Sequence, residues 1–180
     1  MKKIAIIAAM SVAFTAAGVN AASTGTITFN GVVTSQTCNA TVNGGNSNDG
    51  TITLPTVPVS ALSTNTATAG QTAFTINVSS CTTTANANTV KAYFEKGANV
   101  DTNGRLTNTS TSTPASNVVL QLLEGTTPIN IGDASQTTGT YVTIANNTAT
   151  LPYSVRYYAN GAAATAGNVS SSVMYSLVYK

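Results

Sequence analysis

The sequence contains no histidine and no tryptophan, and only 7% of its residues are charged. The lack of histidine excludes a Ser-His or Cys-His nucleophile pair and any imidazole metal ligand. Serine and threonine are abundant, but the sequence offers no base to activate any of them. We therefore expect that the protein is not an enzyme and that it uses no cofactor or metal ion.

The few carboxylates give two weak candidates for chemistry. The run Asp101-Thr-Asn-Gly104 resembles the start of a calcium loop, but the other oxygen ligands and the distal glutamate are missing. The same run is typical of a turn in which the aspartate side chain accepts backbone hydrogen bonds. Glu95 and Asp101 are residues of the type that glycosidases pair, but two solvated charges beside a turn explain them more simply.

The first residues have the pattern of a secretory signal peptide. A basic start at Lys2 and Lys3 precedes an apolar run, residues 4–14, that is short for a membrane span. Small residues before position 22 suit a signal peptidase, so we predict cleavage after Ala21. A transmembrane anchor is the alternative, but no stop-transfer segment follows.

Export has consequences for the cysteines and for the charge. In an oxidising compartment the only two cysteines, Cys38 and Cys81, most simply form one disulfide; two free thiols are the alternative. A loop of this length gives about 4 kcal/mol of stabilisation in the chain-entropy treatment. Without the leader, five basic residues face five acidic ones, which leaves no electrostatic footprint for nucleic acid or acidic lipid.

Short alternating runs separated by turn residues predict an all-β domain. The composition favours strands and turns, and no long stretch has helical periodicity. Many short strands and one disulfide indicate an immunoglobulin-like sandwich. The expected strands are residues 51–54, 74–79, 90–95, 118–123, 129–131, 141–144, 149–151, 153–159 and 173–179.

The segment directly after the leader is another alternating run. One face of the extended chain carries Gly25, Ile27, Phe29, Gly31 and Val33, and the other carries polar residues. Such a strand can pair within its own domain or leave to pair with another molecule. The first choice would make residues 25–33 the first strand of the fold.

A series of motifs, in order along the chain, resembles the structural subunits of chaperone–usher fimbriae, specifically the type 1 fimbrial (pilin) family. Each motif is weak alone, and together they cover nearly everything after the leader. They are residues 25–38, Ile52–Val57 (Ile-x-Leu-Pro-x-Val), Phe74–Cys81, Asp101–Asn108, Asn117–Leu122, Val155–Ala159, Gly167–Asn168 and Tyr175–Lys180. The loop 43–49 and residues 82–89 fit no pattern of the family.

The resemblance implies an incomplete immunoglobulin-like β-sandwich that lacks its final strand. A donor strand from a periplasmic chaperone, and then from the neighbouring subunit, fills the resulting groove; this is an established mode of strand addition. It also implies a signal peptide over residues 1–21, a donor-strand extension over residues 22–37 and a pilin domain over residues 38–180. The outer-membrane usher is the third implied partner, and the filament lies on the cell surface.

The resemblance assigns roles to two sets of residues. The donor face is Gly25, Ile27, Phe29, Gly31 and Val33, with Gly31 at a shallow point of the acceptor groove. The strand that contacts the chaperone carries Val173, Tyr175, Leu177 and Tyr179 and ends at Lys180, whose terminal carboxylate basic residues of the chaperone would bind. A freestanding secreted binding module, for example a carbohydrate-binding sandwich, is the alternative, but the sequence lacks the usual aromatic platform.

Overall fold

The computed structural model describes residues 26–28, 31, 33, 37–82 and 87–180. Residues 1–33 and 34–180 are separate compact units, and the fold described below is that of the second unit. The predicted signal peptide lies outside the described residues. The helices of the described residues are two four-residue 3-10 segments, and no described helix is long and apolar enough to cross a membrane.

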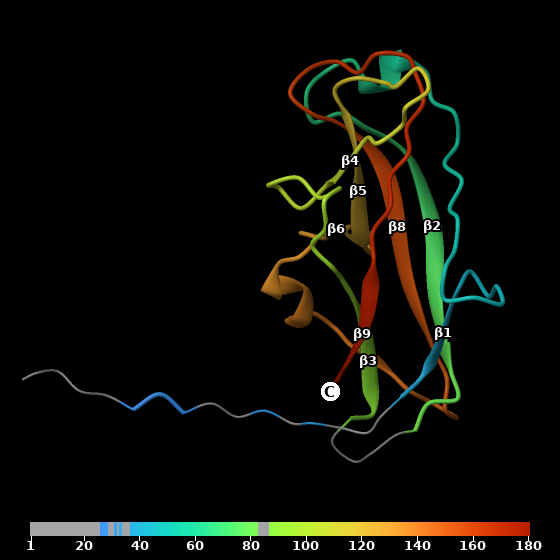
Figure 1. Cartoon of the computed structure of the whole chain (residues 1–180), viewed down its shortest axis with the longest axis vertical. Coiled ribbons are helices and arrows are strands. Elements are labelled where there is room, and N and C mark those ends of the chain that lie inside the picture. The colour runs from blue at the N-terminus through green and yellow to red at the C-terminus, as the bar shows by residue number, and fades with distance from the viewer. Residues whose placement is uncertain (1–25, 29–30, 32, 34–36, 83–86) are drawn as a thin grey trace, which may run out of the picture. The chain divides into compact units, whose positions relative to one another are not determined.

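Two antiparallel sheets form a β-sandwich, as predicted (Figure 1). The larger sheet has the order β1-β2-β8-β5-β4, with β6 paired to β5, and the smaller sheet has the order β7-β3-β9. The elements are β1 (Asn39–Val42), η1 (Val59–Leu62), β2 (Thr68–Ser79), β3 (Thr89–Phe94), β4 (Leu106–Thr107), β5 (Val118–Glu124), β6 (Thr127–Pro128), η2 (Ala134–Thr137), β7 (Val142–Thr143), β8 (Ala149–Ala159) and β9 (Tyr175–Tyr179).

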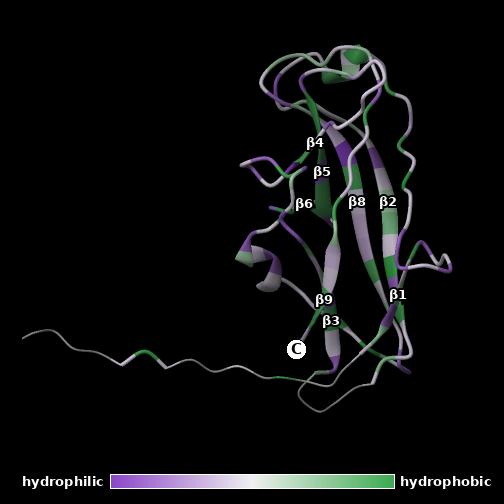
Figure 2. Ribbon diagram, viewed as in Figure 1, coloured by the Kyte–Doolittle hydropathy of each residue, from purple (hydrophilic) through white to green (hydrophobic). Residues whose placement is uncertain are grey.

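The core lies between the sheets because each long strand alternates apolar and polar residues. Phe74, Ile76 and Val78 of β2 are buried, whereas the residues between them are half-buried. The same alternation gives bands of hydrophobic colour along β2 (Figure 2). Strand β5 is buried at six successive positions, 118–123, which confirms the prediction that both of its faces are covered.

Strand β8 is one continuous strand where the sequence predicted two, and it contains a proline. Pro152 is the Cα partner of Thr75 on β2. The Thr75 N–H donates to the Asn43 side chain and its carbonyl accepts from the Asn43 N–H, so both groups point toward β1. This position is therefore a non-hydrogen-bonded pair, and on its other side β5 pairs only with residues 154–159. Pro152 breaks no ladder hydrogen bond because its nitrogen faces the unpaired side.

Two of the expected strands are absent from the structure. Residues 51–54 form no strand, although Ile52 and Leu54 still pack against the core, and residues 129–131 form none because they turn away after one bond from the Ile129 N–H to the Leu122 carbonyl. Conversely, β1 was not predicted. It is four residues long and half-exposed, so its pattern is too short to detect, and it exists because β2 offers an edge to pair with.

Candidate functional site

Strand β9 lies at the edge of the three-stranded sheet. It pairs with β3 from Phe94↔Tyr175 to Val90↔Tyr179, and no second partner pairs with it among the described residues. Alternate side chains of this segment pack against the core: Val173, Tyr175, Leu177 and Tyr179. This is the set that the sequence placed on one face, so the alternation predicted there is confirmed.

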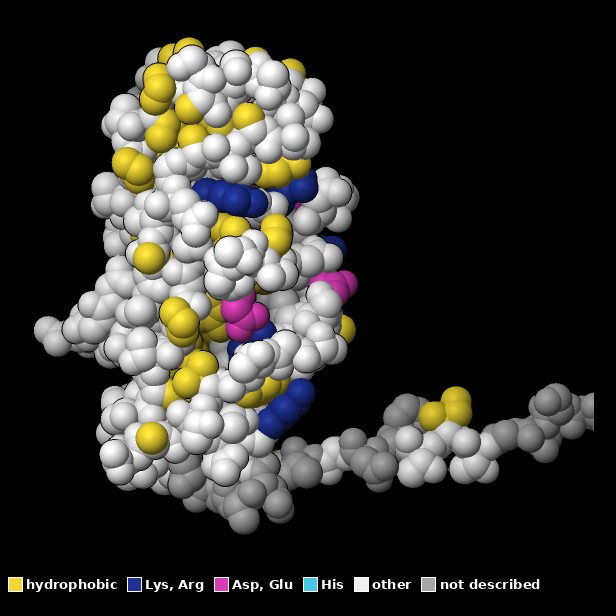
Figure 3. Space-filling model, turned by 180° about the vertical axis from the view of Figure 1, so that it is seen from behind, with side chains coloured by type: hydrophobic (Ala, Val, Ile, Leu, Met, Phe, Trp, Pro, Cys, Tyr) yellow, Lys and Arg dark blue, Asp and Glu magenta, His cyan; other side chains and the backbone are white. Residues whose placement is uncertain are grey.

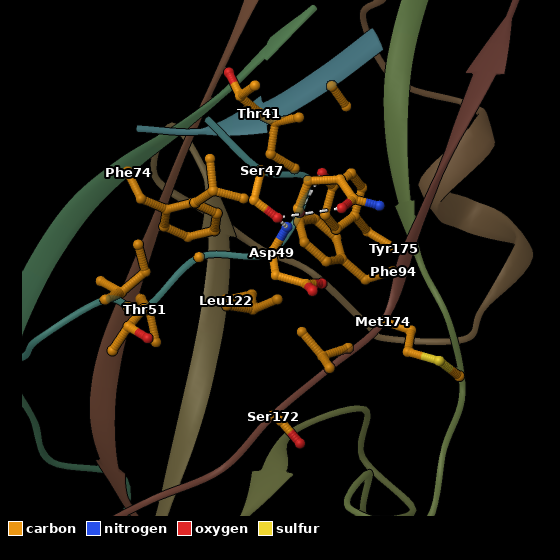
Figure 4. Close-up of a pocket in the computed structure, with 18 of the residues that line it drawn as sticks. Thr41, Ser47, Asp49, Thr51, Phe74, Phe94, Leu122, Ser172, Met174 and Tyr175 are labelled. Carbon is orange, nitrogen blue, oxygen red and sulfur yellow. Dashed lines mark hydrogen bonds between the residues drawn. The ribbon is translucent and has the colours of Figure 1, made fainter. Parts of the chain in front are cut away.

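A large groove runs beside β9 into the sandwich. Its volume is about 1550 Å³, well above the roughly 300–1,000 Å³ of typical small-molecule pockets. One wall is the stretch 38–54, the other is the stretch 169–177, and core side chains lie between the walls (Figure 4). These core side chains are Phe74, Ile76, Phe94, Leu106, Leu120, Leu122 and Val155.

The groove is suited to bind a polypeptide segment in extended conformation. Its base is the apolar core itself, and its rim includes the unpaired backbone edge of β9. A strand laid along β9 would gain main-chain hydrogen bonds and bury every second side chain in the core. Among the described residues that line the groove, Asp49 is the only one with a charged side chain, which leaves the groove little means of electrostatic recognition. The back of the sandwich, in contrast, shows several Lys, Arg, Asp and Glu side chains (Figure 3).

The disulfide predicted from the two cysteines is present and holds the wall that lies across from β9. Cys38 and Cys81 are bonded, with an S–S distance of 2.08 Å, and close a loop over a sequence separation of 43. The bond joins the residue before β1 to the end of β2, beyond the Asn39↔Ser79 pair. It therefore fixes the start of the groove wall to the core strand beneath it.

The end of β9 is tied down within the chain. The Lys180 main-chain oxygen accepts from the N–H groups of Asn88 and Thr89, each at 2.9 Å, and from the Thr89 hydroxyl. The Lys180 ammonium donates to the Thr137 carbonyl at 2.9 Å and lies 4.4 Å from the centre of the Tyr141 ring. These contacts hold the last strand in register with β3.

Burial raises the pKa of two tyrosines of β9, of which Tyr175 lines the groove. The pKa of Tyr175 is raised by burial and also by the nearby carboxylate of Asp49, and the pKa of Tyr179 is raised by burial. Both phenols therefore stay protonated beyond their ordinary range and can donate hydrogen bonds. The sequence did not single out Asp49 or the loop that carries it.

The predicted donor face is described only in part. Gly25 and Phe29 lie outside the described residues. Ile27 is 77% exposed, Val33 is fully exposed and Gly31 is exposed; none of the described residues in 25–33 belongs to a strand. A Cβ placed on Gly31 would meet no atom within 4 Å, so its own surroundings do not require glycine.

The two weak sites noted in the sequence have structural explanations. The Asp101 carboxylate accepts from the N–H groups of Asn103 and Arg105, each at 2.8 Å, which is the side-chain turn expected there. The Glu95 carboxylate accepts from the exposed Ser176 hydroxyl at 2.6 Å. Within the described ranges, no cluster of three or more acidic or sulfur ligands is placed to hold a metal ion.

The known proteins that this chain resembles in sequence are fimbrial proteins. The family model described as "Type-1 fimbrial protein, A" matches residues 54–180. The chain is 44% identical over 165 residues to the major fimbrial subunit SMF-1 of Stenotrophomonas maltophilia (strain K279a), covering 88% of this chain and 94% of that protein. It is 45% identical over 163 residues to the F17 fimbrial protein of Escherichia coli, covering 87% of each.

A solved structure of a chaperone–usher pilus shares the fold. A chain of that structure aligns with a TM-score of 0.59 at 20% identity, over 88% of this chain and 96% of that one. The relatives are fimbrial subunits that this chain matches over most of its length, which favours a filament subunit over a freestanding binding module. The chain therefore belongs to the type-1 fimbrial protein family and is a structural subunit of a bacterial surface fimbria.

Proposed function

We propose that this subunit polymerises by donor-strand exchange, in which residues 25–33 of one copy fill the groove beside β9 of the next. The observation that carries the proposal is a groove of about 1550 Å³, with the apolar core as its base, along an unpaired strand edge. An edge of this kind exposes both backbone groups and core side chains, and it aggregates unless it is covered. A strand from another molecule satisfies both requirements at once.

The segment 25–33 is the occupant that best suits this groove. Its apolar residues alternate, and those described, Ile27 and Val33, are exposed to solvent. In the filament we expect Gly25, Ile27, Phe29, Gly31 and Val33 to face the neighbour's core, with Gly31 where the groove is shallow. The division into a signal peptide (1–21), a donor-strand extension (22–37) and a pilin domain (38–180) belongs to the same proposal.

Before assembly a periplasmic chaperone covers the groove, and the outer-membrane usher then exchanges the chaperone's strand for that of the next subunit. Val173, Tyr175 and Leu177 line the groove, and Tyr179 packs against the core on the same face of the strand. These four are the side chains that we expect either strand to contact. Lys180 ends this set. One of its main-chain oxygens is held by Asn88 and Thr89, and in this proposal the other oxygen of the terminal carboxylate meets basic residues of the chaperone. The subunit performs no catalysis and needs no cofactor in this scheme.

The decisive experiment separates polymerisation from folding. Phe29→Ala removes an aromatic side chain that is buried only in the filament, and a buried Phe→Ala change costs about 3 kcal/mol or more. Gly31→Leu adds a side chain where the groove has little room, at about 1–3 kcal/mol. We expect both variants to yield normal amounts of chaperone complex but few or no fibres. Thr28→Ala, on the opposite face of the segment, is the matched control and should form fibres normally.

The alternative, that residues 25–33 are the first strand of their own domain, gives the opposite result. Phe29→Ala would then destabilise the subunit, and its chaperone complex would be lost to proteolysis. Chaperone-complex yield and fibre yield are measured in parallel on the same cells. Normal fibres from Gly31→Leu, or loss of the chaperone complex in both variants, would overturn donor-strand exchange.

A further inference from the structure

The loop that follows β1, residues 43–50, is part of the groove wall and begins with a tight turn fixed to β2. Asn43 and Gly44 have φ angles of 51° and 68°, and two successive left-handed residues reverse the chain sharply. The Asn43 N–H donates to the Thr75 carbonyl, and the Thr75 N–H donates to the Asn43 side chain, both at 2.8 Å. The base of the loop is therefore anchored to the larger sheet.

The rest of the loop folds back onto Val42. The Gly45 N–H donates to the Val42 carbonyl at 3.0 Å, and the Val42 N–H donates to the Ser47 carbonyl at 3.4 Å. Gly50 lies so close that a Cβ there would be 2.4 Å from the Val42 Cβ. This packing allows no side chain at position 50, and it gives the loop a defined path toward the groove.

One hydrogen bond joins this loop to the opposite wall. The Tyr175 hydroxyl donates to the Asn48 main-chain oxygen at 2.9 Å, across 127 positions of sequence. Residues 46–50 line one side of the groove, and Tyr175 of β9 lines the other. Figure 4 shows Ser47 and Asp49 of the loop near Tyr175, with Phe94 beside them.

This bridge crosses the space that a strand beside β9 would take. We propose that loop 43–50 and Tyr175 form a latch that spans the groove of the empty subunit and slows the uptake of a donor strand. The inference rests on the proposed function, because it concerns entry into the same groove. The latch partly covers the apolar core while the groove is empty. Its single solvent-exposed hydrogen bond is weak enough for an incoming strand to replace.

The test is a strand-capture measurement on the mature chain, residues 22–180, at nanomolar concentration so that copies do not fill one another. A fluorescent synthetic peptide of residues 22–37 is added in excess, and the rise of its anisotropy gives the uptake rate. Tyr175→Phe keeps the ring and removes the hydroxyl, and we expect uptake to be roughly two- to tenfold faster. Gly50→Ala displaces the loop from Val42 and should accelerate uptake in the same way while leaving Tyr175 intact.

Tyr93→Phe is the matched control. Tyr93 lies on β3, next to β9, but on the face opposite the buried side chains of Ala92 and Phe94, so removing its hydroxyl should leave the rate unchanged. Equal rates for the wild type, Tyr175→Phe and Gly50→Ala, or slower uptake in Tyr175→Phe, would overturn the latch alone. Failure of the wild type and of every variant to capture the peptide would overturn donor-strand exchange, and the latch with it.

Discussion

Strands β3 and β9 lie side by side in the smaller sheet, but their outer edges differ. Beyond the short pairing with β7 at Thr89 and Val90, the outer edge of β3 is closed by side chains. The Ala92 N–H donates to the Tyr153 hydroxyl at 3.2 Å, and the Phe94 N–H donates to the Gln136 side-chain oxygen at 2.9 Å. The outer edge of β9 instead borders the open groove.

At Phe94, both backbone groups on the outer edge of β3 have hydrogen-bond partners. Gln136 also donates its amide nitrogen to the Phe94 carbonyl at 3.0 Å, so one side chain replaces both bonds of a neighbouring strand. The Gly132 N–H donates to the same carbonyl. Buried backbone groups without partners are costly, which accounts for this protection. The contrast shows that side chains can satisfy the backbone groups of a strand edge that has no neighbouring strand. The outer edge of β9 has no neighbouring strand among the described residues, so it can accept an added strand.

The largest effect is expected at the groove wall across from β9. Replacing both Cys38 and Cys81 with serine releases the loop between them and should lower the free energy of unfolding by about 4 kcal/mol. Urea unfolding followed by circular dichroism measures this. A loss below about 1 kcal/mol would show that pairing between β1 and β2 holds the wall without the bond.

The second-largest effect is expected at high pH, where Tyr153, which bonds to the outer edge of β3, loses its proton. Burial raises the pKa of Tyr153 to about 12 from an ordinary value of 10.0. Below pH 10 both the folded and unfolded states keep the proton, so stability is unaffected. Between pH 10 and 12 only the unfolded state loses it, and stability should fall by up to about 3 kcal/mol. Tyr153→Phe should remove most of this fall, and an equally steep fall in that variant would assign it to other groups.

Opening the closed edge by mutation should have a somewhat smaller effect. Gln136→Ala leaves the Phe94 N–H buried without its partner, which should cost about 2 kcal/mol of unfolding free energy. Gln71→Ala is the control, because its amide bonds to a side chain, Ser154, and satisfies no backbone group; less than 0.5 kcal/mol is expected. Hydrogen exchange at Phe94 should accelerate in Gln136→Ala only.

The smallest effect is expected on the outward face of the open strand. Ser176 is exposed and alternates with the core-packed Tyr175 and Leu177, and its hydroxyl bonds to Glu95, so Ser176→Ala should change stability by less than about 0.5 kcal/mol. The same variant should bind the peptide of residues 22–37 with unchanged affinity, whereas Leu177→Ala, one position along, should bind it more weakly. Equal affinities for the two variants would contradict a role for the inward face of β9.

Much of this contrast could be anticipated from local patterns. The alternation over residues 173–179 predicted the inward face of β9, and the apolar run 118–123 predicted a strand buried on both faces. The turn at Asp101 could also be predicted from the sequence, because the aspartate bonds to residues only two and four positions away. The paired roles of Gln136 and Tyr153 were not, because they act on β3 from 42 and 61 positions away.

The sequence by itself determined the all-β class, the disulfide and the face that each long strand turns to the core. These follow from side-chain periodicity and from having only two cysteines, which are properties of short segments or of composition. Only the tertiary structure decided how side chains close the outer edge of β3, and that loop 43–50 reaches Tyr175. Backbone edges look alike in every sequence, and their partners come from distant residues that meet only when the two sheets pack together.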